Sequence, residues 1–202
     1  MRIYPTRLEM MKDLLRPGSV ICEIGVFTGQ FAAQLLSLQP SKLFLIDPFQ
    51  GMVPSGDADG NNVRTVFLPN VYLQLAEKVS KIDNCILLRG FSHELLPLLP
   101  QNCLDAIYID GDHSYEGVKR DLQIAWHLVR TGGYICGHDY EPNLTKTSNQ
   151  YDFGVKRAVD EFCQEKGLTI FAKGRDGQVS FAIEKIINPP KTLSYYIEPL
   201  KT

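Results

Sequence analysis

The sequence has no hydrophobic run that approaches the roughly 20 residues a helix needs to cross a bilayer. It also has no excess of charge of one sign, because 21 lysines and arginines stand against 23 aspartates and glutamates, for a net charge of −2. A balance of this kind argues against a protein that holds nucleic acid on a basic surface. We therefore expect neither a membrane nor a nucleic acid among its partners.

Paired cysteines are absent as well. An odd number of cysteines without a CxxC pair is typical of reduced packing residues in a cytoplasmic protein, and it argues against a zinc ribbon. The first 18 residues are interrupted by charges and lack an apolar region followed by a small-residue cleavage site, which argues against a secretory signal. The five cysteines are Cys22, Cys85, Cys103, Cys136 and Cys163.

What the 202 residues do contain is a recurring order: an apolar, β-branched run and then a stretch with helical spacing. Near-continuous apolar strands separated by amphipathic helices are typical of a parallel sheet that is covered on both faces. The predicted strands are Ser19–Val26, Lys42–Phe49, Cys85–Arg89, Leu104–Asp110, Gly133–Gly137, Leu168–Ala172 and Val179–Glu184. The predicted helices are Gln30–Leu38, Val63–Lys81, His93–Leu99, Tyr115–Val129 and Val155–Lys166.

These elements predict one doubly wound α/β domain over residues 1–187, with a mostly parallel seven-stranded sheet and an N-terminal helical segment over 1–17. The last two strands have no helix between them, so we expect an antiparallel hairpin at the C-terminal edge. Residues 188–202 form a proline-rich tail, and its tyrosines suggest a contact in a homodimer. The long polar loops Gln50–Asn62 and Glu141–Phe153 follow strand ends, where open α/β sheets bind ligands.

The first candidate for ligand binding is the turn Glu23-Ile24-Gly25-Val26-Phe27-Thr28-Gly29. Its two glycines allow a sharp turn and a close approach to a ligand. The spacing differs from the G-x-G-x-x-G of dinucleotide-binding folds, which disfavours an NAD-dependent dehydrogenase but leaves it as an alternative. Asp47, at the end of the second strand, could accept both hydroxyls of a ribose; the alternative is that it caps the turn before Pro48.

Polar residues also follow the fourth and fifth strands, as Asp110-Gly111-Asp112-His113 and His138-Asp139-Tyr140. We expect both groups at one sheet edge, where Asp110 and Asp139 would suit an oxygen-preferring cation such as Mg²⁺. Imidazole prefers zinc, manganese or iron. Two interpretations stay open: His138 completes a metal site with the two aspartates, or it is a base in a site without metal. His113, neutral near pH 7, is the alternative base.

Four segments resemble the class I S-adenosylmethionine-dependent methyltransferases: E-I-G-V-F-T-G, L-I-D-P-F, Y-I-D-G-D-H-S-Y-E-G-V-K-R-D and G-G-Y-I-C-G-H-D-Y. More narrowly, they are similar to a small bacterial branch near the macrolide-sugar O-methyltransferases and the cephalosporin-cluster methyltransferase-like proteins. The resemblance covers roughly residues 18–185. In the metal-dependent members an acidic residue is usual where this chain has His138, and that departure puts the metal in doubt.

The resemblance implies S-adenosyl-L-methionine as cofactor. It also implies a set of contacts: Glu23 and Gly25 at the methionine part, Gly29 opening the adjacent helix, Asp47 at the ribose, Gly90, Ser92 and Phe49 at the adenine, and Asp110 beside the cofactor. The alternatives for Ser92 and Phe49 are a helix N-cap and a plain core residue.

The expected function is methyl transfer to an oxygen of a small molecule, such as a sugar, a glycoside or a phenol. Asp110, His113 and His138 would carry catalysis, and Mg²⁺ or another divalent cation would assist. A methyltransferase-like protein that binds the cofactor without turnover is the main alternative. Outside this set, we expect His93 and the segment Lys119–Asp121 on exposed helix surfaces.

Overall fold

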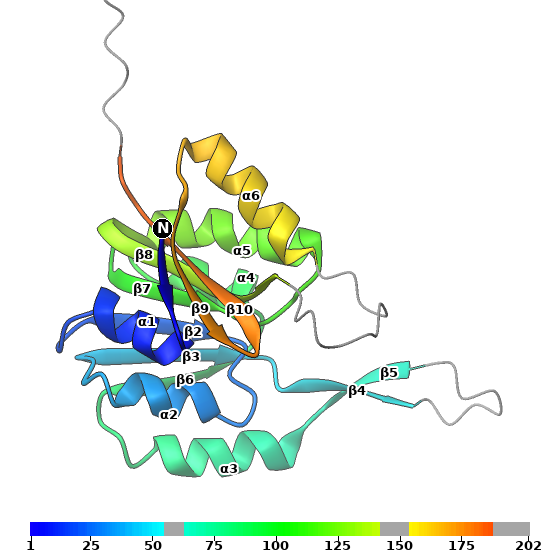
Figure 1. Cartoon of the computed structure of the whole chain (residues 1–202). Coiled ribbons are helices and arrows are strands. Elements are labelled where there is room, and N and C mark those ends of the chain that lie inside the picture. Colours follow the sequence, from blue (N-terminus) through cyan, green and yellow to red (C-terminus); the bar gives the residue numbers. More distant parts are fainter. Residues whose placement is uncertain (55–62, 142–153, 188–202) are drawn as a thin grey trace, which may run out of the picture.

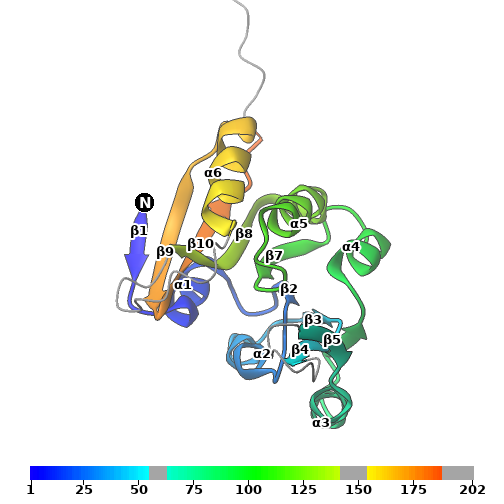
Figure 2. The same cartoon turned by 90° about the vertical axis from the view of Figure 1, so that its right-hand side faces the viewer.

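A large twisted sheet with helices on both faces forms the body of the molecule (Figures 1 and 2), as described by a computed structural model for residues 1–54, 63–141 and 154–187. The sheet has eight strands in the order β1-β9-β10-β8-β7-β2-β3-β6. The strands are β1 (Arg2–Tyr4), β2 (Val20–Ile24), β3 (Lys42–Asp47), β6 (Cys85–Arg89), β7 (Leu104–Ile109), β8 (Val129–Glu141), β9 (Ile170–Asp176) and β10 (Gln178–Glu184).

The helices alternate with these strands along the chain, as the sequence pattern predicts. They are α1 (Arg7–Leu14), α2 (Gln30–Leu36), α3 (Pro69–Val79), α4 (Ser92–Leu95) with the 3₁₀ turn η1 (Leu96–Leu98), α5 (Tyr115–Leu128) and α6 (Val155–Lys166). Among the described residues, none of these helices is both long and apolar enough to span a bilayer.

The sheet confirms the doubly wound arrangement. Strands β6, β3, β2, β7 and β8 are parallel, whereas β10 is antiparallel to both β8 and β9. The chain leaves β2 towards β3 on one side and returns to β7 on the other, so a topological switch point lies between β2 and β7. Ligands bind at such a point, outside the carboxyl ends of the strands.

The N-terminal segment differs from the expected helix over 1–17. Residues Arg2–Tyr4 form β1, which pairs in parallel with β9 and adds an eighth strand to the predicted seven. The predicted C-terminal hairpin of β9 and β10 is present, but β9 is not the edge strand of the sheet, because β1 pairs with it. Helix α1 follows at Arg7, where the Thr6 side chain accepts a hydrogen bond from the backbone N–H of Glu9.

The expected helix over Val63–Lys81 is wrong at its beginning. Residues Val63–Phe67 form β5, which pairs with β4 (Gln50–Pro54) in a separate antiparallel arm that leaves the sheet after β3 (Figure 1). The β-branched V-R-T-V-F sequence favours a strand, and Pro69 in the first turn of α3 favours a helix start only there. The remainder of the predicted loops and the tail, at 55–62, 142–153 and 188–202, lies outside the described residues.

The core has one layer on each face of the sheet. On one face, Ile107 and Ile135 pack with Leu122 of α5 and Phe162 of α6. On the other, Tyr108 of β7 meets Phe31 of α2, with ring centroids 4.4 Å apart, and helices α1 and α3 cover the rest. Because Ile107 and Tyr108 point to opposite faces, Asp110 lies on the α2 side, two residues after Tyr108.

Candidate functional site

A cavity of about 450 Å³ opens at the switch point, above the carboxyl ends of β2, β3, β6 and β7. Five of the predicted cofactor residues line it: Gly25, Asp47, Phe49, Ser92 and Asp110. Its other lining residues are Ile24, Phe27, Ile46, Pro48, Gln50, Phe91, His93, Gly111, Asp112 and Arg120.

The glycine turn forms one wall of the cavity because of its contact with β7. Gly25 has a φ of +82°, and a β-carbon there would stand 2.0 Å from the carbonyl oxygen of Asp110. No side chain other than hydrogen fits at this position. Gly29 has a φ of +79° as the N-cap of α2, so both glycines are required by the backbone.

The carboxyl group of Glu23 lies in an unusual environment. It is 2% exposed, and its Oε2 has no hydrogen-bond partner among the described residues. Burial raises the pKa of Glu23 well above its ordinary value, and the charges of Asp110 and Asp47 add to this, whereas Arg7 opposes it. A buried carboxyl oxygen without a partner beside a glycine turn suits a cationic group of a ligand.

Asp47 holds two turns and faces the cavity at the same time. Its Oδ2 accepts from the backbone N–H of Phe27 at 2.8 Å and its Oδ1 from that of Phe49 at 2.5 Å. Both phenylalanines have positive φ angles, +49° and +52°, so the carboxylate stabilises strained backbone on either side of the cavity. Each oxygen can accept a second bond, so the ribose role and the turn role are compatible.

The predicted adenine end is built from the segment after β6. The N-cap of α4 is Phe91, so Ser92 is not the N-cap. Instead its hydroxyl donates to Oδ1 of Asp121 at 2.7 Å. Gly90 donates its backbone N–H to the carbonyl of Asp47 at 3.1 Å, which ties this segment to β3. Phe49 lines the cavity but is 1% exposed, as a core residue would be.

Two residues in this region, Asp121 and His93, contradict the predicted exposed helix surfaces. Asp121 is 1% exposed. Arg120 is exposed, as expected, and it lines the cavity. His93 also lines it, with its ring 5.5 Å from that of Phe91 and its buried Nδ1 without a hydrogen-bond partner among the described residues. The signal that could have found His93 is its place in the short segment that follows the end of β6.

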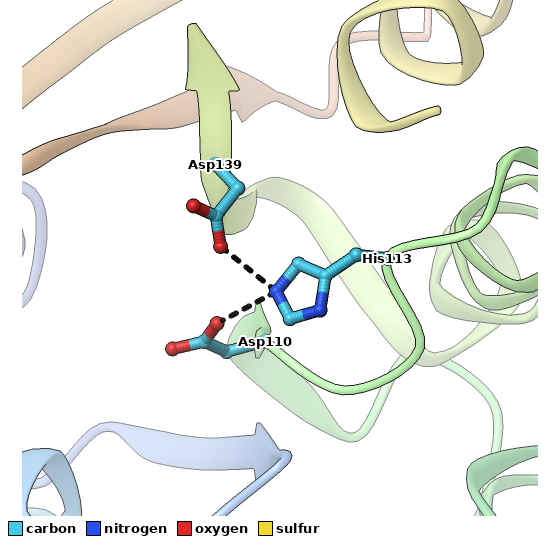
Figure 3. A group of neighbouring side chains, drawn as sticks. All are labelled: Asp110, His113 and Asp139. Carbon is cyan, nitrogen blue, oxygen red and sulfur yellow. Dashed lines mark hydrogen bonds and ion pairs between the residues drawn. The ribbon is translucent and has the colours of Figure 1, made fainter. Parts of the chain in front are cut away.

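Next to the cavity, three side chains converge: Asp110 directly after β7, His113 in the turn that follows, and Asp139 in β8 (Figure 3). The Nε2 of His113 is 2.8 Å from Oδ2 of Asp139 and 3.3 Å from Oδ1 of Asp110. His138 lies beside them, with Nδ1 3.1 Å from Oδ2 of Asp139 and 3.8 Å from Oδ1 of Asp110. Asp139 has a φ of +56°, which is strained for a non-glycine residue and is common at functional sites.

The structure thus brings together all four residues predicted from the two strand ends. Among the described residues, however, the compact group of candidate metal ligands is Asp110, His113 and Asp139, whose donor atoms lie within 4.8 Å of one another. From the sequence, His138 was expected in that set, and His113 takes its place. Two carboxylates and an imidazole form a donor set that a divalent cation accepts, with His113 deprotonated.

The two neighbouring carboxylates reverse the protonation state that was expected for His113. Burial lowers the pKa of His113, but hydrogen bonds to Asp110 and Asp139 outweigh it and raise the pKa to about 9. For Asp139, burial raises the pKa, and the contacts with His113 and His138 outweigh it and lower the pKa. Without a cation, His113 is therefore protonated near pH 7, and it is not the neutral base that the sequence suggests.

Arg7 is a member of the site that no motif indicated. Its Nη1 is 3.4 Å from Oδ2 of Asp110, and its guanidinium carbon is 4.3 Å from the centroid of the Phe31 ring. Its backbone N–H donates to Oδ1 of Asp176 at 2.9 Å. The contact between Arg7 and Asp110 joins residues more than 100 positions apart, so no local sequence pattern could have predicted it.

The chain spans about half the length of a curated relative that it matches, an uncharacterized protein, R132, of Acanthamoeba polyphaga mimivirus. The two are 43% identical over 122 residues, which are 59% of this chain and 50% of the relative.

Solved structures with the same fold include proteins that are named for different substrates. A putative rRNA methylase from Clostridium thermocellum superposes with a TM-score of 0.63 at 17% identity, over 90% of this chain and 94% of that one. A putative caffeoyl-CoA O-methyltransferase from Staphylococcus aureus gives 0.62 at 14% identity, over 88% and 82%. Aeropyrum pernix fibrillarin, solved with natively bound S-adenosyl-L-methionine, gives 0.58 at 16% identity, over 87% and 72%.

A family model described as a methyltransferase domain matches residues 22–140. The matched segment begins in β2 and ends in β8, so it contains the glycine turn, Asp47, Asp110 and Asp139. It also makes up more than half of the chain, and the protein therefore belongs to the methyltransferase domain family, with the fold of its S-adenosylmethionine-dependent class I members.

Proposed function

We propose that this protein transfers a methyl group from S-adenosylmethionine to a hydroxyl oxygen of a small molecule, such as a sugar, a glycoside or a phenol. The observation that carries the proposal is the position of Asp110. One side of this residue lines the 450 Å³ cavity, and its carboxylate also joins the group of His113 and Asp139. A cofactor in the cavity would therefore end beside groups that can hold and deprotonate an acceptor.

The cavity suits the cofactor in several respects. Glu23, directly before the lining residues Ile24 and Gly25, has a buried carboxyl oxygen without a hydrogen-bond partner among the described residues, and Asp47 and Ser92 line the cavity. When bound, the cofactor supplies a methyl group that is already activated on a sulfonium sulfur. The task of the protein is then to align the acceptor oxygen with that methyl group and to remove its proton.

The acceptor proton has two candidate routes. In the first, Asp110, Asp139 and His113 would hold a divalent cation, which would lower the pKa of the acceptor hydroxyl, and His138 beside Asp139 would take the proton. In the second, no metal is involved and a histidine acts alone. The raised pKa of His113 argues against His113 as the base of the second route, because a protonated imidazole between two carboxylates cannot accept a proton, and His138 is then the candidate base in both routes.

The choice of a small acceptor rests on charge. The whole chain has a net charge of −2, whereas binding of RNA is supported by a basic surface. The fold does not decide between the two, because the rRNA methylase and the O-methyltransferase structures match almost equally, at 0.63 and 0.62.

The test is a calorimetric titration with S-adenosylhomocysteine, with Mg²⁺ present and again after chelation. Micromolar binding supports the cofactor, and a change on chelation supports a metal next to it. Absence of binding in both conditions contradicts the proposal. Transfer of label from methyl-labelled cofactor into a pool of sugars and phenols, against an RNA pool, then distinguishes turnover from binding alone and identifies the acceptor class.

A further inference from the structure

The guanidinium of Arg7 is held firmly in place, and apart from an interaction with the hydroxyl of Tyr108 its polar partners are distant. Its backbone is fixed by the 2.9 Å hydrogen bond to Asp176, and its head lies on the ring of Phe31. Its ion pairs are long, at 3.4 Å to Asp110 and 3.6 Å from Nε to Asp176, whereas charge-assisted hydrogen bonds are about 2.7–2.9 Å. Among the described residues, its buried Nε has no hydrogen-bond partner.

Such a side chain has donors to spare for an anion. A guanidinium presents five N–H donors in a rigid fork that fits a carboxylate with two parallel hydrogen bonds. The side chain of Arg7 is only 20% exposed, so a ligand would meet it in surroundings where water competes little.

The position of Arg7 shows on which side of Asp110 it lies, that of the glycine turn or that of the two histidines. Phe31 is in the first turn of α2, directly after the glycine turn, whereas His113 and His138 lie on the other side of Asp110. Asp110 presents Oδ2 to Arg7 and Oδ1 to the histidines. Arg7 therefore belongs to the cofactor side of Asp110.

A second observation points to the same ligand group. Glu23, whose negative charge is favoured by the charge of Arg7, has a buried oxygen without a hydrogen-bond partner among the described residues. A carboxyl group and a guanidinium that are both incompletely paired, and that both lie near Asp110 of the cavity lining, match the ammonium and the carboxylate of an amino acid.

We propose that Arg7 binds the α-carboxylate of the cofactor's methionyl group, opposite Glu23, and so makes α1 a part of the cofactor site. The inference rests on the cofactor of the proposed function. It goes beyond the matched methyltransferase segment, because Arg7 lies before residue 22, where that segment begins.

Two ligands that differ only in this carboxylate provide the test: S-adenosylmethionine and decarboxylated S-adenosylmethionine. We expect the unaltered protein to bind the first about tenfold or more tightly than the second, in line with the loss of a charge-assisted pair. Arg7→Gln should remove most of this preference by weakening S-adenosylmethionine alone. Arg7→Lys, which keeps the charge but not the fork, should fall between.

The ratio of the two affinities is independent of any partial unfolding of a variant, so the result does not depend on Arg7→Gln being fully folded. Arg2→Gln is the matched control, because Arg2 is an exposed arginine of the same segment that pairs with Asp13. It should leave the preference unchanged.

Three results overturn the inference. Equal weakening of both ligands by Arg7→Gln would mean that Arg7 acts only through Asp110 or the fold. A preserved preference in Arg7→Gln, or no preference in the unaltered protein, would mean that the carboxylate is recognised elsewhere or not at all, while the proposed function stands. If the unaltered protein binds neither ligand, the proposed function falls together with the inference.

Discussion

The α-carbon of Gly25 lies so close to Asp110 that an added β-carbon would stand 2.0 Å from the Asp110 carbonyl oxygen. The backbone N–H of Asp110 also donates to Ile24 at 2.9 Å, so the glycine turn and the end of β7 form one rigid unit. The glycine turn is therefore fixed by backbone contacts relative to the group of Asp110, His113 and Asp139, the acidic cluster.

We predict that Gly25→Ala abolishes binding of S-adenosylhomocysteine and lowers the free energy of unfolding by about 2 kcal/mol or more, through strain and overlap. Calorimetry and urea unfolding measure both effects. Gly18→Ala is the control, because Gly18 has a φ of +88° but nothing within 4 Å of its added β-carbon. It should lose about 1 kcal/mol and keep its binding. Similar losses in both variants would contradict the role of the contact with Asp110.

Glu23→Gln should stabilise the ligand-free protein at neutral pH and weaken cofactor binding. The pKa of Glu23 is higher in the folded than in the unfolded protein, so its folded state loses stability as the pH rises above the ordinary carboxyl pKa of about 4.3. The glutamine has no charge to bury and should show a flatter dependence. Unfolding at about pH 5 and about pH 8 measures the difference, and an equal slope in both proteins would count against the buried charge.

For His113 we predict a stability contribution that disappears at alkaline pH. Its folded pKa of about 9 lies above the unfolded value, so the stabilisation is complete below about pH 6.5 and is lost as the pH rises through about 9. In the presence of a chelator, His113→Gln should cost about 2 kcal/mol near pH 6 and almost nothing near pH 10. Urea unfolding across this range measures it. A cost that does not change with pH would show that the ion pairs contribute nothing.

A divalent cation should raise the unfolding temperature of the protein, and Asp139→Asn should remove most of that rise. Thermal unfolding with Mg²⁺, Mn²⁺ or Zn²⁺ against a chelator measures the shift, and His113→Gln should reduce it more than His138→Gln. Asp83→Asn, which changes an exposed carboxylate at the opposite end of β6, serves as the control. A shift that survives in Asp139→Asn would exclude the cluster as the metal site.

Much of the fold could be predicted because periodicity and strand ends are local signals. Strand Cys85–Arg89 and helix Val155–Lys166 appear with the predicted bounds, and the residues after β7 and β8 meet as expected. The predicted start of α3 was wrong because β5 pairs with β4. This is a contact between two segments, and the spacing of apolar residues within one segment does not reveal it.

The site was predicted less completely, for the same physical reason. Asp121 was expected at the surface because its neighbours in sequence are charged, but it accepts a hydrogen bond from Ser92 of α4, a contact between two helices. Arg7 contributes through contacts with Asp110 and Asp176, and the protonation of His113 depends on two carboxylates from different strands. Residue types reveal candidates, whereas partners and charge states require the tertiary structure.

The pairing of β1 with β9 has a consequence for the order in which the site is assembled during synthesis. Arg2 is in register with Ala172, and Arg7 is anchored on Asp176, so the first residues of the chain wait for partners about 170 positions later. Closing so long a loop is slow compared with forming local elements. A ribosome-bound chain that has reached only β8 already contains the glycine turn and the acidic cluster, but it cannot yet hold Arg7 in place.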